Sequence, residues 1–378
     1  MEILSNQAEI FPLVIAQGEA FCNRKEEQAL LNFNIRHLKH TLVIAPRRYG
    51  KTSLTMKVLD DMKVPSQGID FFTITDEASV IRQLHHGISS LITKILPSRK
   101  NILNRISSIF QKFNPTLEVS LVGQKLKFQI NEKQTVPEDI IELLNGLDRI
   151  ANEEGTIAVL NIDEFQQIRT LKNHVAIEGA IRHSMERSRA VMYLFSGSTR
   201  HLLKNQFDDV DSPLFKSCHK CTLDRIHADD YRKHLTTAAI KNWQQEDNLN
   251  FIERIITLTK CHSYYVNALA SKLWRQDTVP TPEIVDKTWD LLARMEKTNF
   301  IQIVMNLSTN QRAMLLGLAA NPTNAPTSQE FLTIINLAAA SANQALQVLL
   351  ENDLVYMSQD NLFRVLDPLL EYTLNFIN

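Results

Sequence analysis

The strongest constraint in this sequence is a short apolar run that leads directly into a glycine–lysine–threonine turn. The run covers Thr41–Ala45, and a helical pattern of apolar residues begins at Leu54. Between them the chain reads Pro46-Arg47-Arg48-Tyr49-Gly50-Lys51-Thr52-Ser53. A strand, a loop ending in Gly-Lys-Thr and a helix form the setting of the phosphate-binding P-loop, whose pattern is G-x-x-x-x-G-K-[ST]. Ala45 occupies the first glycine position, so the sequence departs from the pattern once.

Each residue type in this loop suits phosphate binding. Gly50 lets backbone N–H groups wrap a phosphate, and Lys51 brings a positive charge to the β- and γ-phosphates. The hydroxyl of Thr52 can ligate Mg²⁺. The following helix points its positive N-terminal end at the anion. We therefore expect ATP with Mg²⁺ to bind here through residues 46–53, with Lys51 also assisting catalysis.

A second apolar run ends in two adjacent carboxylates. Residues 157–162 are apolar apart from Asn161, and Asp163 and Glu164 follow them. In a P-loop enzyme, Asp163 would hold the Mg²⁺, and Glu164 would orient and polarise the attacking water as a general base. A solvated turn is the alternative for such a pair. Its position at a strand end, about 110 residues after the P-loop, favours the catalytic interpretation.

A third apolar run ends in small hydroxyl residues and an arginine. Residues 191–195 are followed by Ser196, Gly197, Ser198, Thr199 and Arg200. Ser196 or Ser198 could hydrogen-bond to the attacking water, and Arg200 could stabilise the transition-state charge from within the same chain. The alternative is a Ser/Gly turn followed by a surface arginine.

Strand and helix patterns alternate along the first 226 residues. Beyond the first run, the predicted strands are 69–75, 156–162, 190–196 and 221–226. The predicted helices between them are 78–96, 102–113, 138–152 and 175–187, and residues 118–130 alternate as a hairpin does. This alternation predicts an α/β fold, a P-loop NTPase parallel sheet with helices on both faces.

The strand patterns stop after residue 226. Helices are expected at 228–246, at 250–274 and from Glu283. The last segment predicts helices at 309–320, 328–335 and 341–352, strands at 354–357 and 362–365, and a final helix capped by Asp367 and Pro368. That order is the winged-helix arrangement. The predicted domains are a P-loop ATPase core (1–226), a helical lid with a connecting helix (227–305) and a winged helix (306–378).

Composition excludes several classes of protein. The 41 Lys and Arg residues nearly balance the 42 Asp and Glu residues, which argues against a generic nucleic-acid coat protein. Four cysteines are too few for a disulfide scaffold of this size. The start of the chain lacks the features of a signal peptide, and no apolar run approaches the ~18 residues of a membrane span. We expect a cytoplasmic, helix-rich protein with no membrane span.

Together, these motifs resemble the prokaryotic AAA-like (AAA+) ATPases of the archaeal-ATPase type. That group lies near the signal-transduction ATPases with numerous domains (STAND) and the origin-recognition initiators. The resemblance covers nearly the whole chain. It rests on the P-loop at 47–53, the Walker B residues 163–166, the sensor strand at 195–198 and the following segment at 212–215.

The resemblance implies further residues near the nucleotide. Phe21–Glu27 is similar to the family's N-terminal Phe-x-Asn-Arg-x-x-Glu box, which lies against the adenine in relatives. This implies that Asn23 and Arg24 lie near the nucleotide. His262 falls where the family has a Gly-His-Pro-Tyr-like turn in its helical lid, although cysteine and serine replace the glycine and the proline here. Family members carry helical lids and often C-terminal winged helices.

The charge of the last segment bears on its partner. Residues 301–378 contain two basic and six acidic side chains, and the predicted helix 341–352 contains no Lys or Arg. Phosphate contacts supply most non-specific DNA affinity, and winged-helix DNA readers place a helix in the major groove. We therefore expect a slow ATPase that acts as a nucleotide-dependent switch on a protein partner or through self-association.

Two alternatives remain open. One is a DNA-associated ATPase of initiator or transposition-helper type, in which the basic segment 94–112 would contact DNA. The other is an ATP-binding scaffold with very slow hydrolysis, although the presence of Glu164 argues for turnover.

Overall fold

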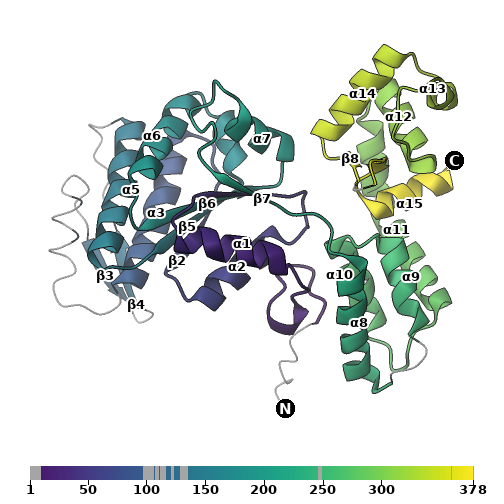
Figure 1. Ribbon diagram of the computed structural model, residues 1–378, viewed down its shortest axis with the longest axis horizontal. Coiled ribbons are helices and arrows are strands. Elements are labelled where there is room, and N and C mark those ends of the chain that lie inside the picture. The colour runs from purple at the N-terminus through teal and green to yellow at the C-terminus, as the bar shows by residue number, and fades with distance from the viewer. Residues whose placement is uncertain are drawn as a thin grey trace. The chain divides into compact units, whose positions relative to one another are not determined.

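The computed structural model describes residues 10–96, 106, 110, 116–120, 123–127, 135–245, 249–358 and 360–377. They form two compact units. The sheet unit contains residues 25–47 and 54–223, and the helical unit contains residues up to 24, 48–53 and 224–378. Figure 1 labels the helices and strands of both units. The contacts of residues 48–53 therefore group most of the P-loop with the helical unit.

Five parallel strands form the centre of the sheet unit, in the order β2-β5-β6-β1-β7. They are β1 (Thr41–Ile44), β2 (Ser66–Asp70), β5 (Ala158–Asp163), β6 (Val191–Gly197) and β7 (His219–Thr222). The pairing places Ile44 opposite Gly197, and Ile162 opposite Phe195. Because the strands are parallel, the carboxyl ends of β1, β6 and β5 share one edge of the sheet. The three motifs predicted from the sequence follow these three ends.

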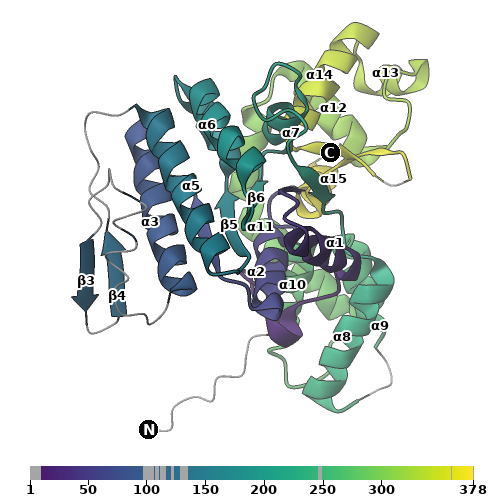
Figure 2. The ribbon, with the colours of Figure 1, turned by 60° about the vertical axis from the view of Figure 1, so that its left-hand side comes forward.

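Helices cover both faces of this sheet (Figure 2). Helices α3 (Glu77–Ile95), α5 (Val136–Glu153) and α6 (His174–Arg187) lie on one face, and α1 (Lys25–Arg36) and α2 (Lys51–Met62) lie on the other. Alternate strand residues face opposite ways, so Leu42 and Tyr193 enter the large core with α3 and α5. Their neighbours Val43 and Met192 are buried outside that core. The predicted α/β fold with helices on both faces is confirmed.

Three predicted elements differ in their bounds. The strand expected at 69–75 ends at Asp70, because the Asp70 carboxylate turns the chain by accepting a hydrogen bond from Phe72 N at 2.8 Å. The strand expected at 221–226 is β7, which ends at Thr222 because its partner β1 ends opposite it. The helix expected at 250–274 is two helices, α9 (Asn250–Thr259) and α10 (Ser263–Leu273). Lys260 and Cys261 have left-handed backbones that separate them.

The insertion between α3 and α5 is described only in part. Strands β3 (Thr116–Ser120) and β4 (Gly123–Lys127) form an antiparallel hairpin, which overlaps the predicted hairpin at 118–130. Apart from Ile106 and Phe110, which are buried in the large core, the helix expected at 102–113 and most of the basic segment 94–112 lie outside the described residues.

The helical unit has one continuous core. The elements that form it are α8 (Ala228–Trp243), α9, α10, α11 (Pro282–Met305), α12 (Thr309–Ala320), α13 (Gln329–Ile335), α14 (Ala339–Glu351), β8 (Val355–Met357), β9 (Phe363–Val365) and α15 (Pro368–Ile377). The buried Trp289 ring lies against Tyr265 of α10 and Tyr372 of α15. The Asp367 carboxylate accepts from Leu369 N and Leu370 N, as expected for the cap of the last helix. The predicted winged-helix arrangement is confirmed.

Among the described residues, no single helix is long and apolar enough to cross a membrane. Taken together, α13 and α14 reach that length and composition, but they are bent by 77° at the break between them.

Two glycines in helices of the sheet unit predict opposite effects on stability. A Cβ on Gly87 of α3 would lie 2.4 Å from Ile69 Cγ1, whereas a Cβ on Gly179 of α6 would meet no atom within 4 Å. We expect Gly87→Ala to destabilise the sheet unit, because overpacking costs about 1 to 3 kcal/mol against roughly 1 kcal/mol gained in helix propensity. We expect Gly179→Ala to stabilise it by about 0.5 to 1 kcal/mol. Hydrogen exchange in α3 and α5 measures both effects, and equal shifts would contradict this packing argument.

Candidate functional site

The P-loop bridges the end of β1 and the start of α2. Arg48 and Gly50 have positive φ values of 66° and 84°, which turn the chain sharply before the helix. Lys51 is the first residue of α2, and Thr52 next to it is exposed. The first N–H groups of a helix have no partner within the helix. Together with the helix dipole, these groups make the start of α2 suitable for an anion.

The N-terminal box, Phe21–Glu27, is hydrogen-bonded to this loop. The Arg24 guanidinium is buried and donates to the Tyr49 carbonyl oxygen at 3.2 Å. The Asn23 amide donates to the Asp230 carboxylate on α8. Asn23 and Arg24 both have left-handed backbones, with φ of 49° and 68°. Such conformations cost of order 1 to 3 kcal/mol each and tend to occur at functional sites.

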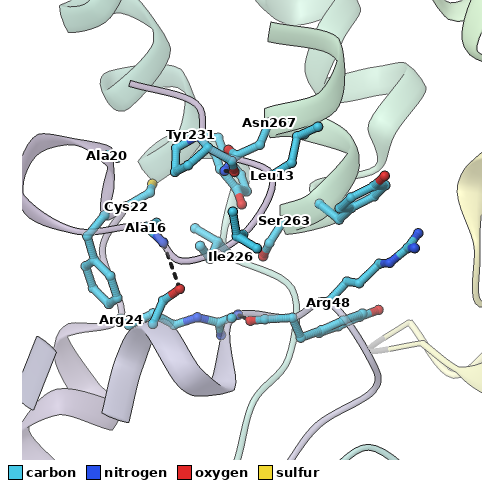
Figure 3. Close-up of a pocket in the computed structure, with 17 residues that line it drawn as sticks. Leu13, Ala16, Ala20, Cys22, Arg24, Arg48, Ile226, Tyr231, Ser263 and Asn267 are labelled. Atoms are coloured by element: carbon cyan, nitrogen blue, oxygen red, sulfur yellow. Dashed lines mark hydrogen bonds between the residues drawn. The ribbon is translucent and has the colours of Figure 1, made fainter. Parts of the chain in front are cut away.

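A cavity of about 160 Å³ opens between this box, the P-loop and helices α8 and α10 of the predicted lid (Figure 3). A cavity of similar volume in another protein takes up benzene, so the space suits a flat ring system. Its lining is apolar and aromatic with a few polar groups, as is typical of small-molecule sites. The lining residues are Pro12, Leu13, Val14, Ala16, Ala20, Phe21, Cys22, Arg24, Arg48, Tyr49, Gly50, Ser53, Ile226, Tyr231, Ser263, Tyr264 and Asn267.

The lining includes some of the residues predicted to bind nucleotide and several that the sequence did not reveal. Arg24, Arg48, Tyr49, Gly50 and Ser53 are the predicted residues that border the cavity. The N-terminal residues 12–16 and the helical residues Tyr231 and Asn267 were not anticipated. The sequence signal for the first group is the apolar run at 11–15 just before the box. No comparable signal marks single polar residues on two lid helices.

The His262 ring packs against the ring of Tyr49 in the P-loop. His262 is 5% exposed, and its ring meets the Tyr49 and Tyr265 rings at 4.9 and 5.0 Å. Burial, together with the nearby Arg225 guanidinium, lowers the pKa of His262 to about 3. The neutral ring therefore packs against the loop. His262 itself is not among the residues that line the cavity, whereas its neighbours Ser263 and Tyr264 are.

Arg225 links the P-loop tyrosine to two other parts of the helical unit. Its Nε donates to the Tyr49 hydroxyl at 3.3 Å. Its Nη1 donates to the Lys260 carbonyl at the end of α9 (2.9 Å), and its Nη2 donates to the Leu366 carbonyl just after β9 (2.8 Å). One guanidinium thus joins the P-loop, the lid and the winged helix by directional bonds. No motif in the sequence around Arg225 indicates this role.

In the sheet unit, the end of β5 holds its two carboxylates in different ways. Asp163 Oδ1 accepts from Ser196 Oγ at 2.6 Å and from Glu164 N at 3.0 Å. Glu164 has a left-handed backbone with φ of 50°. Its Oε2 accepts from Ser198 Oγ at 2.9 Å and from the Gln166 amide at 2.5 Å. The strand ends therefore bring together Asp163, Glu164, Ser196 and Ser198, four of the candidate residues named from the sequence.

The network continues to the first arginine of the P-loop. Arg47 Nε donates to Ser198 Oγ at 3.1 Å, so Arg47, Ser198 and Glu164 form one hydrogen-bonded chain. Arg200 is the first residue of α7 (Arg200–Asp208) and is half-buried. Pro46 is buried just after β1. The partnership of Gln166 with Glu164 was not predicted, because a glutamine after an acidic pair has no characteristic pattern.

Comparisons with known proteins agree with this architecture. Residues 298–375 match the family described as a probable winged helix domain. The chain is similar to the Walker-type ATPase PABY2304 of Pyrococcus abyssi, with 16% identity, a TM-score of 0.69, and coverage of 97% of this chain and 99% of that one. It is also similar to the ORC2 protein of Aeropyrum pernix in its ADPNP–ADP complexes, with 14% identity, a TM-score of 0.56, and coverage of 98% and 97%. No curated protein matches.

This structural similarity establishes the fold. The chain has the fold of a P-loop ATPase with a C-terminal winged helix, and the resemblance drawn from its motifs is confirmed at that level.

The buried His262 predicts a pH dependence of stability. Its folded pKa, about 3, lies below the ordinary value of 6.5, so the unfolded chain binds more protons between these values. The contribution of His262 to the free energy of unfolding is therefore fully present above pH 6.5. It falls by about 1.4 kcal/mol per pH unit as the pH drops from 6.5 toward 3. His262→Gln should remove about 1 kcal/mol of the difference in stability between pH 7.5 and 5.5.

Urea unfolding followed by tryptophan fluorescence measures this effect, because all three tryptophans lie in the helical unit. His227→Gln is the matched control, since His227 is exposed and lies in the same unit. An unchanged pH dependence in the His262 variant would contradict the assignment.

Proposed function

We propose that this chain binds and hydrolyses ATP, and that its nucleotide state is passed to the lid and the winged helix. The observation that carries the proposal is that two hydrogen-bonded chains start from the P-loop. One runs from Arg47 through Ser198 to Glu164. The other runs from Tyr49 through Arg225 to the Leu366 carbonyl. The first leads to the proposed catalytic carboxylate, and the second leads to the winged helix.

The cavity and the P-loop are proposed to bind different parts of ATP. The purine is proposed to occupy the cavity beside Arg24 and Tyr231, with Asn23 holding the box in place through Asp230. The phosphates are proposed to lie on residues 46–53, against the N–H groups at the start of α2 and the Lys51 ammonium. His262 would contribute through the position of Tyr49.

The residues present fit a magnesium ion held jointly with phosphate. Mg²⁺ commonly binds one or two carboxylates together with substrate phosphates. Thr52 offers an exposed hydroxyl, and Asp163 offers a carboxylate that Ser196 orients. Within the described residues, no group of three or more His, Cys, Asp and Glu side chains could hold a metal ion by itself. When bound, Mg²⁺ would neutralise charge that develops on the phosphates.

Hydrolysis requires a water in line with the bond to the γ-phosphate. Glu164 is proposed to orient this water and take its proton, because Oε2 is held by Ser198 and Gln166. Lys51 and Arg200 would stabilise charge on the transferred group, which is the main catalytic contribution in phosphoryl transfer. Ser198 would tie the position of Glu164 to that of Arg47.

The proposed switch is supported by hydrogen bonds between the winged helix and the proposed lid. Lys260 at the end of α9 donates to the Glu371 carboxylate at 2.6 Å, and the Tyr265 hydroxyl donates to Asp367 at 2.6 Å. Arg225 joins the same region to Tyr49. A nucleotide that moves the P-loop tyrosine favours one arrangement of these bonds. A partner that prefers that arrangement is then coupled to ATP.

The winged helix is proposed to contact protein, either a partner or a second copy of the chain. Helix α14 contains no Lys or Arg. Arg364, one of the two basic residues in the segment, donates to the Asp360 carboxylate and to Ser358. A surface with this charge balance offers few of the phosphate contacts on which DNA affinity depends.

Three measurements test the ATPase. Lys51→Ala should abolish ATP turnover, because the phosphates lose their main cation. Glu164→Gln should keep ATP binding and lower turnover by at least a hundredfold, because the amide cannot accept the proton.

Duplex DNA should leave turnover unchanged. Turnover that rises with DNA and collapses with added salt would favour the DNA-associated alternative instead.

The role of Arg225 has its own test. In the wild type, hydrogen exchange at residues 363–366 should differ between the ADP-bound and ATP-analogue-bound states. Arg225→Gln should remove most of this difference while ATP still binds, because the link from Tyr49 is cut. Arg254→Gln, which removes an exposed lid arginine paired with Asp286, is the control and should keep the difference. A difference that survives in Arg225→Gln would overturn the proposed route.

A further inference from the structure

Gln166 is a buried glutamine that reaches back to the proposed catalytic carboxylate. It is 2% exposed, and its Nε2 donates to Glu164 Oε2 at 2.5 Å. A glutamine two residues after an acid does not reach back along a regular strand, where alternate side chains lie about 6 to 7 Å apart. The left-handed backbone at Glu164 and the 3₁₀-helix η2 (Phe165–Thr170) turn the chain so that the two side chains meet.

The turn is anchored by aromatic packing. Phe165 is fully buried, and its ring lies 4.5 Å from the Phe195 ring and 5.9 Å from the Phe207 ring. Ile168 of the same turn is also fully buried. Gln166 is therefore held between two buried apolar residues of one short helix. Rigid support of this kind is what a residue needs to hold another side chain in a fixed position.

The neighbouring strand leaves room for this glutamine only because residue 197 has no side chain. A Cβ on Gly197 would lie 2.0 Å from Gln166 Oε1 and 2.9 Å from Leu203 Cδ1. Contacts this short force the glutamine to move. The glycine between Ser196 and Ser198 thus admits the Gln166 amide at the end of β6.

The burial of Gln166 has a cost that packing alone does not repay. Within the described residues, Gln166 Oε1 is buried and has no hydrogen-bond partner. A buried polar group left unpaired costs about 1 to 3 kcal/mol. An apolar side chain of the same size would avoid that cost next to the Phe165 cluster. Among the described residues, the side-chain hydrogen bond of this amide goes to Glu164.

The bonds to Glu164 are all on one side of its carboxylate. In the described part of the chain, the three side-chain and backbone donors to this group, Gln166 Nε2, Ser198 Oγ and Ser198 N, all end on Oε2. Oε1 is left to accept from water. A carboxylate held by one oxygen presents the other in a fixed direction, which is the requirement for a general base.

We propose that Gln166 is a positioning residue for ATP hydrolysis: it clamps Oε2 of Glu164 so that Oε1 faces the attacking water, and Gly197 provides the space for it. This inference rests on the proposed ATPase function and adds a residue to it. Gln166 itself takes no proton and touches no substrate.

The first test replaces the amide with an apolar side chain of similar length. Gln166→Met should lower kcat by roughly tenfold to a hundredfold, since small misplacements of a reacting group can cost that much. Its Kd for ATP should stay close to that of the wild type, and its thermal unfolding midpoint should not fall, because the unpaired Oε1 is removed. Gln167→Met, the same change at the next residue of η2, should leave kcat unchanged. A kcat in Gln166→Met equal to that of the wild type would overturn the proposal.

The second test uses the close contact with Gly197. Gly197→Ala should lower kcat about as much as Gln166→Ala, because each breaks the same clamp. The double variant should be no slower than either single variant, since Gln166→Ala removes the atoms that the new methyl group meets. Effects on kcat that multiply in the double variant would show that the two residues act independently, and would overturn the proposal.

The wild type and Lys51→Ala separate this inference from the proposed function. Wild-type turnover that depends on Lys51, together with full activity in Gln166→Met, would remove the positioning role and keep the ATPase. A wild type with no Lys51-dependent turnover would remove both.

Discussion

The register of three parallel strands determines where every proposed catalytic group lies. Because β6 pairs with β1 on one side and with β5 on the other, the residues after Ile44, Ile162 and Phe195 emerge at neighbouring points of one sheet edge. This pairing is what places Ser196 within 2.6 Å of Asp163. It also places Ser198 within 2.9 Å of Glu164. A shift of β6 by one residue would reverse the faces of its side chains and separate these pairs.

The P-loop combines this edge with a second set of contacts. Arg47 is bonded to the end of β6 in the sheet unit, whereas Arg24 and Arg225 hold Tyr49 within the helical unit. Guanidinium groups that bond to backbone carbonyls form directional links, and breaking such a bond at a buried group leaves polar atoms unpaired at a cost of about 1 to 3 kcal/mol. The P-loop therefore has directional hydrogen bonds to the end of β6 and, through Arg225, to the Leu366 carbonyl of the winged helix.

The parts of the molecule that could be predicted from the sequence are those set by local patterns. Short apolar runs, the Gly50-Lys51-Thr52 turn and the acidic pair at the end of β5 sufficed to predict the sheet, the strand-end groups and the winged helix. The misplaced ends of β2 and β7 were decided by the length of the partner strand or by a side-chain turn at Asp70. The break between α9 and α10 depends on the left-handed backbones of Lys260 and Cys261. Neither residue is a glycine, so the sequence gives no sign of the break.

The contacts that could not be predicted join residues far apart in the chain. Arg225 meets Tyr49 and Leu366 across 176 and 141 residues, and nothing local marks it. Gln166 depends on the absence of a side chain at residue 197, which becomes visible only when two strand ends are placed together. The cavity likewise combines the N-terminal segment with Tyr231 and Asn267 of the lid. Sequence patterns locate the chemistry, while its positioning depends on tertiary packing.

A crystal structure with Mg²⁺ and a non-hydrolysable ATP analogue tests the central claim most directly. The account predicts the purine in the cavity beside Arg24 and Tyr231, the phosphates on residues 46–53, and a water within hydrogen-bond distance of Glu164 Oε1. A nucleotide bound elsewhere, or a Glu164 carboxylate turned so that Oε2 faces the γ-phosphate, would contradict it.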